Sequence, residues 1–392
     1  MSNAVKTEMG LEDILKRCQD AIEGTAPQEV QRWKEKTGGK AVGYFPVYSP
    51  MELIYANGIL PVGILGGGTN LDIERADAYF GSFVCSIVKT TTEMGLRGDM
   101  KYLDGMIFHS ICDAARNLGS VYKGNFSSQF VVDYIHYPQN PSSPAAVDYL
   151  VGELNRIQKS LEKINGKPLK EDSLRQSFRA YNENRRLIRN LYRIKKETPH
   201  LLSIAEAYQL VRAGYYLPPE EHSEMLRIAL EEIPQRKRKE RDTVRVVLEG
   251  SFCEQPPVDF LKILDESGCA VVDDDLLIGR RYYEEDIPLD GDPIRALADS
   301  YLNRSSYTSV THDWRKPRSE RLIERVRNSG ATAVVFGIAK FCEPALLDYP
   351  VFKRALEQAG IPHIVLEFEE KMWTFESLKN DLATFVESIL FD

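Results

Sequence analysis

Residues 244–273, VRVVLEGSFCEQPPVDFLKILDESGCAVVD, contain the order of elements that decides the fold. A valine-rich apolar run is followed by a loop with two prolines, an amphipathic stretch that ends at Gly268, and a second apolar run. This order predicts strand, loop, helix and strand, because proline is favoured where a helix begins and glycine where a helix ends. The apolar runs do not alternate with polar residues, which is typical of parallel strands covered on both faces.

The same order of elements occurs twice more in the chain. Residues 41–65 contain it with a predicted helix at 51–57, and residues 332–368 contain it with a predicted helix at 351–359. A glycine follows each of these helices. Because the unit is present in both halves, the sequence predicts an α/β fold with two doubly wound parallel-sheet domains of the Rossmann or flavodoxin type.

Between the two halves the sequence is typical of long helices. Residues 137–144 form a proline-rich break. Apolar residues then recur at spacings of three and four, as on one face of a helix: Leu150, Leu154, Ile157, Leu161 and Ile164. We therefore expect an N-terminal α/β domain at 1–140, a helical region at 141–240 and a C-terminal α/β domain at 241–392.

The charge and hydropathy of the chain disfavour binding to nucleic acid and association with membranes. The 392 residues include 50 Lys and Arg and 58 Asp and Glu, for a net charge of -8, which does not favour binding to nucleic acid or to an anionic membrane. The basic run at 236–241 predicts a solvated helix end or linker. The apolar runs are too short to span a bilayer, and charges interrupt residues 1–17 where a signal peptide has an apolar core. We expect a cytoplasmic protein.

Cysteines follow strand-like runs in three loops. They are Cys112 in FHSICD, Cys253 in SFCEQP and Cys342 in KFCEP, while Cys85 opens a predicted helix in the same half as Cys112. Loops of this kind surround the crevice where a parallel α/β sheet binds ligands. Thiolates from distant loops at one crevice indicate a soft metal or an iron-sulfur cluster. The alternative for each cysteine is a small buried hydrophobe, since disulfides are not expected in a reducing compartment.

Several familiar motifs are missing from the sequence. There is no Gly-x-x-x-x-Gly-Lys-Ser/Thr loop, so any ATP would have to be bound by a partner. The glycine run at 65–70 could approach a phosphate but is more typical of a turn. There is no Cys-x-x-Cys and no His-x-x-x-His pair, which disfavours structural zinc and a ferredoxin-type cluster.

Five segments resemble, in order along the chain, the benzoyl-CoA reductase and 2-hydroxyacyl-CoA dehydratase family. They are GYFP from Gly43, PMELIYANGILP from Pro50, HSICD from His109, VDDDLLIGR from Val272 and KFCEP from Lys340. Within this family, the segment LEGSFCEQPP from Leu248 and the size of the chain are most similar to the smaller cluster-carrying subunit of the ATP-dependent benzoyl-CoA reductases.

The resemblance implies a 4Fe-4S cluster held by three cysteines, which correspond here to Cys85, Cys112 and Cys342. It implies four kinds of partner: a related larger cluster-carrying subunit, ATP-hydrolysing activator subunits, ferredoxin and an aromatic acyl-CoA substrate. The implied reaction is the two-electron dearomatisation of benzoyl-CoA to a cyclohexadiene-carbonyl-CoA. Two alternatives stay open: a subunit of a 2-hydroxyacyl-CoA dehydratase, and a non-catalytic electron-relay or scaffold subunit.

Two residues are candidate proton donors for the reaction. His109 and Glu52 lie in loops on the same side of the predicted N-terminal sheet as the cysteines. His109 could instead cap the helix that follows Cys112, and Glu52 could instead satisfy the positive end of its own helix.

The remaining candidates are three further cysteines and two arginines. Cys253 could be a fourth ligand, a ligand of an additional or larger cluster, or a packed thiol. Cys18 and Cys269 fall on apolar elements and are expected in the core. Arg280 and Arg281 follow three aspartates, so they could form ion pairs or bind a CoA phosphate.

Overall fold

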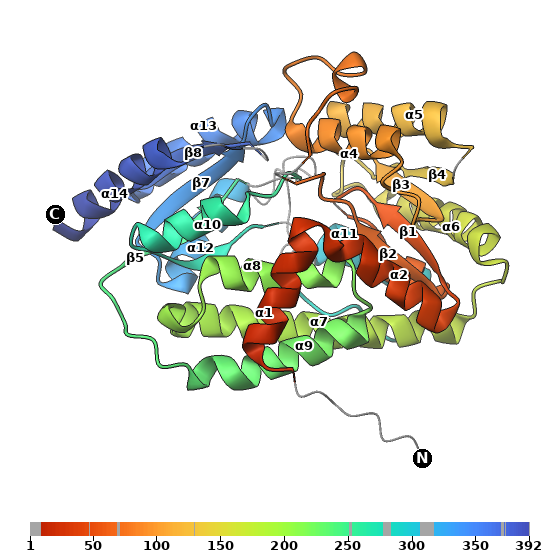
Figure 1. The fold of residues 1–392 in the computed structure, drawn as a ribbon, viewed down its shortest axis with the longest axis horizontal. Helices are drawn as coiled ribbons and strands as arrows, with labels where there is room; N and C mark the ends of the chain where they lie inside the picture. The colour runs from red at the N-terminus through yellow and green to blue at the C-terminus, as the bar shows by residue number, and fades with distance from the viewer. Residues whose placement is uncertain are drawn as a thin grey trace.

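A computed structural model of the chain describes residues 9–46, 48–68, 71–128, 130–250, 253–276, 284–305, 317–369, 372 and 374–391. Two parallel β-sheets lie on opposite sides of the molecule, and a layer of helices, including the long helix α7, runs beneath both (Figure 1). The two sheets confirm the predicted fold class.

The first sheet contains four parallel strands in the order β2-β1-β3-β4. Its strands are β1 (Lys40–Tyr44), β2 (Ile59–Gly63), β3 (Gly105–His109) and β4 (Val131–Ile135). In register, Val42 lies opposite Gly105, and Gly105 lies opposite Val131. All five residues of β3 are buried, as expected for a central strand that helices cover on both faces.

The second sheet repeats this arrangement in the order β6-β5-β7-β8. Its strands are β5 (Val244–Glu249), β6 (Cys269–Asp274), β7 (Ala333–Ala339) and β8 (His363–Phe368). In both sheets the second strand along the chain lies on one side of the first strand, and the third and fourth strands lie on the other side. The switch points therefore lie between β1 and β3 and between β5 and β7, where α/β proteins bind ligands at the carboxyl ends of the strands.

The helices fall into three groups along the chain. The helices of the N-terminal part are α1 (Leu11–Asp20), α2 (Ala26–Thr37), α3 (Met51–Ala56), α4 (Ser86–Arg97) and α5 (Asp113–Phe126). The helices between the sheets are α6 (Ala146–Asn165), α7 (Glu171–Glu197), α8 (Ile204–Arg212) and α9 (Pro219–Glu232). The helices of the C-terminal part are α10 (Val258–Glu266), α11 (Pro293–Asn303), α12 (Arg318–Ser329), α13 (Glu343–Ala359) and α14 (Glu376–Phe391). Among the described residues, no helix is both long and apolar enough to cross a membrane.

The glycines that end the helices of the repeated unit have the expected conformation. Gly58, Gly268 and Gly360 have φ values of 69°, 86° and 66°. This left-handed region is open to glycine without a steric penalty, and it turns the chain from each helix into the next strand.

The predicted start of one helix was wrong. A helix was expected at 351–359, but α13 begins at Glu343 and contains Pro350 in its interior. Pro344 is accommodated in the first turn, where its missing N–H is not needed. Pro350 removes one hydrogen bond of the helix, and the helix nevertheless continues through it, with Phe352 and Leu356 buried on one face.

The helices between the sheets contact both of them. Helix α7 packs against α3 beside the first sheet and against β6 of the second. Lys195 of α7 forms an ion pair with Asp274 at the end of β6, and both side chains are only 1% exposed. Helix α11, from the C-terminal part of the sequence, packs against α6. The domain boundaries at 140 and 240 therefore stay a prediction.

Candidate functional site

The three cysteines assigned by the resemblance each lie immediately before the first residue of a helix. Cys85 is the N-cap residue of α4, Cys112 of α5 and Cys342 of α13. The N–H of Ala115, in the first turn of α5, donates to Cys112 Sγ at 3.5 Å. The first turn of a helix carries partial positive charge, which stabilises a thiolate placed there.

These cysteines line one cavity of about 280 Å³. Cys112 follows β3 and Cys342 follows β7, while Phe45, which follows β1, is part of the same wall. Loops from both switch points therefore meet at this cavity. Much of the remaining wall is apolar, and it is formed by Phe80, Phe83, Val84, Ile87, Val88 and Phe341.

The cysteines surround the cavity but do not converge on a single point. Among the described residues, no group of three His, Cys, Asp or Glu side chains is placed to hold one metal ion. In an iron-sulfur cluster each thiolate binds a different iron, so the thiols must be farther apart than ligands that share one ion. The donor chemistry and the placement around a cavity fit a cluster better than a mononuclear metal.

Burial makes the thiols of Cys85 and Cys112 weaker acids than an exposed cysteine. Burial raises the pKa of Cys85 well above its ordinary value, and electrostatic interactions with the nearby acidic groups of Glu254, Cys342 and Cys112 add smaller contributions. Burial also raises the pKa of Cys112, although N–H groups of α5 oppose the shift. Metal binding at these positions would therefore release protons.

A fourth cysteine, Cys253, lies on the same cavity wall and is 5% exposed. It follows β5, so it occupies the position in the second sheet that was expected from the repeated unit.

The residue after it, Glu254, also lines the cavity and was not singled out from the sequence. Its carboxylate accepts hydrogen bonds from Ser86 Oγ at 2.5 Å and from the N–H of Ile87 at 3.1 Å. Both donors belong to the first turn of α4, directly after Cys85. Glu254 thus joins the loop after β5 to the helix that begins at a candidate ligand.

The other two cysteines are core residues, as predicted. Cys18 on α1 is 0% exposed and Cys269, the first residue of β6, is 2% exposed. Neither lines the cavity.

Glu52 is buried away from the cavity wall. The guanidinium of Arg185, on α7, donates to Glu52 Oε1, and the Ser177 hydroxyl donates to the Glu52 backbone oxygen at 2.8 Å. Among the described residues, Glu52 Oε2 has no hydrogen-bond partner. Glu52 therefore pairs with a cation of another helix, an arrangement that the sequence did not predict.

His109, the last residue of β3, is fully buried and does not line the cavity either. Its Nε2 shares a hydrogen bond of 2.8 Å with Ser49 Oγ. Within the described part of the chain, Nδ1 has no partner. Burial lowers the pKa of His109 to about 3, so its imidazole is neutral near pH 7.

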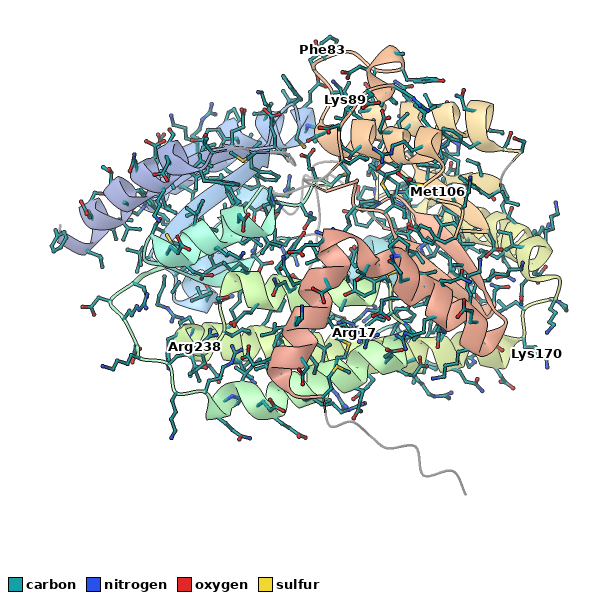
Figure 2. All side chains as sticks on the ribbon, viewed as in Figure 1. Arg17, Phe83, Lys89, Met106, Lys170 and Arg238 are labelled. Carbon is teal, nitrogen blue, oxygen red and sulfur yellow. The ribbon has the colours of Figure 1, made fainter. Side chains whose placement is uncertain are left out.

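The segment that leads to Cys85 is fastened by a buried carboxylate of α4. Glu93 Oε2 accepts hydrogen bonds from the N–H groups of Glu74, Arg75 and Ala76 at 3.1, 2.8 and 2.9 Å. Burial alone would raise the pKa of Glu93, but these three donors hold it below its ordinary value. This contact sets the path of the chain toward Phe83, which protrudes at the top of Figure 2.

Other predicted features lie elsewhere. Arg280 and Arg281 are outside the described residues, as are the last two residues of the glycine run at 65–70. In the basic run at 236–241, both Arg236 and Arg238 pair with Glu206.

Comparisons with known proteins identify relatives over nearly the whole chain. The family model for "2-hydroxyglutaryl-CoA dehydratase, D-component" matches residues 46–389. A benzoyl-CoA reductase subunit of Thauera aromatica is 36% identical over 97% of this chain and 99% of its own length. The (R)-phenyllactyl-CoA dehydratase beta subunit of Clostridium sporogenes is 30% identical over 99% of this chain and 100% of its own length. The lactoyl-CoA dehydratase beta subunit of Anaerotignum propionicum is 30% identical over 97% and 99% of the two chains.

Proposed function

The chain belongs to the 2-hydroxyglutaryl-CoA dehydratase D-component family, and from this premise we propose that it is the iron-sulfur subunit of an ATP-dependent benzoyl-CoA reductase. The observation that carries the proposal is the meeting of Cys85, Cys112 and Cys342 at one apolar-walled cavity. The higher identity to a reductase subunit than to the dehydratase subunits favours reduction over dehydration.

In the proposed site, the three cysteines would hold a 4Fe-4S cluster through one thiolate each. When bound, the cluster would supply single electrons at low potential. The rest of the site belongs to the chain itself: each of the three cysteines lies at a helix N-terminus, and the apolar side chains of the wall lower the local dielectric, which strengthens charge interactions. Three protein ligands for four irons leave one iron open to a small ligand.

The proposed reaction adds two electrons and two protons to the ring of benzoyl-CoA and yields a cyclohexadiene-carbonyl-CoA. The electrons would come from ferredoxin, driven by ATP hydrolysis in separate activator subunits, because this sequence contains no Gly-x-x-x-x-Gly-Lys-Ser/Thr loop. His109 and Glu52 stay the proposed proton donors, but each would first have to gain a proton, because His109 is neutral near pH 7 and the Glu52 carboxylate is paired with Arg185. Since neither lines the cavity, a proton from His109 would have to pass through Ser49 or a water molecule.

Assembly with a related larger subunit is part of the proposal. The relatives are named as subunits. Exposed apolar side chains fit a protein partner: Phe83 and Phe341, which line the cavity, are 70% and 40% exposed, and Leu347, farther along α13, is 76% exposed. Exposed apolar groups of this size gathered in one region are typical of protein interfaces.

Two observations support the alternatives. The dehydratase beta subunits match the chain over their whole length, which supports a dehydratase subunit that acts on a 2-hydroxyacyl-CoA. The absence of His109 and Glu52 from the cavity wall supports an electron-relay or scaffold subunit whose partner binds the substrate.

The deciding experiment uses the chain produced with its partner subunits and purified without oxygen. The proposal expects about four irons and four labile sulfides for this chain, and ATP-dependent loss of benzoyl-CoA with a diene product. Dehydration of a 2-hydroxyacyl-CoA after a single priming by ATP would establish the first alternative. A chain that contains zinc alone, or no metal, would refute the cluster.

A further inference from the structure

We propose that Glu254 is a positioning residue that holds the Cys85 end of α4 and lowers the reduction potential of the cluster; this inference rests on the function proposed above. Glu254 is 2% exposed and lies on the wall of the cavity. It approaches α4 from the opposite half of the sequence, through the loop after β5.

The contact of Glu254 with α4 is a helix cap supplied by another part of the chain. Cys85 occupies the N-cap position but makes no side-chain capping hydrogen bond. Glu254 takes over that function, since it accepts from Ser86 Oγ and from the N–H of Ile87. Donors at the end of a helix favour an ionised acceptor, so the contact keeps a negative charge beside Cys85.

Burial distinguishes Glu254 from the other acidic residues at the cavity. Asp113 and Glu343 also line it, but both are exposed. A charge in contact with water is screened, whereas a charge surrounded by protein acts through a lower effective dielectric. Of the three, Glu254 is therefore expected to have the strongest effect on the potential of a neighbouring group.

The sign of the effect follows from electrostatics. Reduction adds an electron to the cluster, and a fixed negative charge nearby makes that addition less favourable. The three helix N-termini act in the opposite direction, because their partial positive charge favours reduction. Glu254 offsets this at α4, which suits a site that must deliver electrons at low potential.

The test compares three variants of the full chain, each purified anaerobically with its partner subunits. Glu254→Gln removes the charge and keeps the shape. Ser86→Ala removes one hydrogen bond of the same contact and keeps the charge. Glu343→Gln removes an exposed charge next to Cys342. Iron content, sulfide content and a redox titration followed by electron paramagnetic resonance are measured for each, with the partner's cluster as a constant background.

We expect all three variants to retain their iron. Glu254→Gln should make reduction at least tenfold more favourable, which corresponds to about 59 mV for one electron, and the two controls should not change the potential. An unchanged potential in Glu254→Gln would overturn the proposal, as would an equal shift in Ser86→Ala. Loss of the cluster in Glu254→Gln would also overturn it, since the residue would then act only as structural support. Iron-free wild-type protein would instead refute the proposed function.

Discussion

Glu93 offers a sharp test of how the segment before Cys85 is held. Its Oε2 atom accepts three backbone N–H groups, from residues 74, 75 and 76, and the side chain is 1% exposed. Glu93→Gln keeps an oxygen at this position but removes its charge. Hydrogen bonds to charged groups contribute about 1.5–3 kcal/mol each and neutral ones about 0.5–1.5 kcal/mol. A loss of about 1 kcal/mol for each bond gives about 3 kcal/mol in total, which corresponds to roughly 100-fold in the local opening equilibrium.

Hydrogen exchange followed by mass spectrometry measures this opening directly. Peptides that cover residues 74–76 should exchange roughly 100-fold faster in Glu93→Gln at neutral pH. The matched control is Glu74→Gln, which removes an exposed carboxylate of the same segment and should leave exchange unchanged. Because the folded-state pKa of Glu93 is lowered, its contribution is complete above the unfolded value and is lost as the pH falls through the folded pKa. Unchanged protection in Glu93→Gln, or equal loss in both variants, would refute this reasoning.

Further predictions concern the ligands, pH and assembly. Cys342→Ala should abolish or convert the proposed cluster, whereas Cys269→Ala should only lower the free energy of unfolding, on the order of 1 kcal/mol, through lost packing. Iron analysis distinguishes the two variants. A loss of iron in Cys253→Ala as complete as in Cys342→Ala would show that three ligands are too few. Burial raises the pKa of Asp265 to about 7, above its unfolded value of about 3.9, so this group makes the protein less stable as the pH rises between these values. Asp265→Asn should therefore be more stable than the parent in urea at pH 8, on the order of 1–4 kcal/mol, and equal stability at that pH would contradict the burial of this carboxyl. Leu347→Asp should reduce co-purification of the partner subunit without changing the circular dichroism of the chain, whereas full retention would show that α13 is not at the interface.

The sequence predicted the features that depend on neighbouring residues. Apolar runs without alternation identified the central strands, and the glycines after α3, α10 and α13 marked the helix ends, because both signals are local. The sequence also placed Cys85 at the start of a helix, and Cys112 and Cys342 in loops that follow strands. The N-cap position of Cys342 was not predicted, because it depends on the earlier start of α13. The start of α13 was misplaced because Pro350 suggested a helix boundary, and only the packing of the helix shows that it continues through this residue.

Contacts between distant segments could not be predicted in this way. Glu254 and Ser86 are separated by 168 positions, and no periodicity links them. The pairing of Glu52 with Arg185 likewise depends on where α7 lies against α3. For that reason, the sequence identified Glu52 as a candidate acid but gave no sign that a guanidinium would neutralise it.

The cavity draws its walls from both halves of the chain, and this has a consequence for biosynthesis. Cys85 and Cys112 leave the ribosome more than 200 residues before Cys342 does. At about 5–20 residues per second, that interval lasts roughly tens of seconds. During this time the first sheet can fold, but its two thiols face an incomplete pocket that is open to solvent, oxygen and the wrong metals. Loading of the proposed cluster would therefore have to wait for the second sheet, and iron and sulfide would have to reach a nearly finished polypeptide.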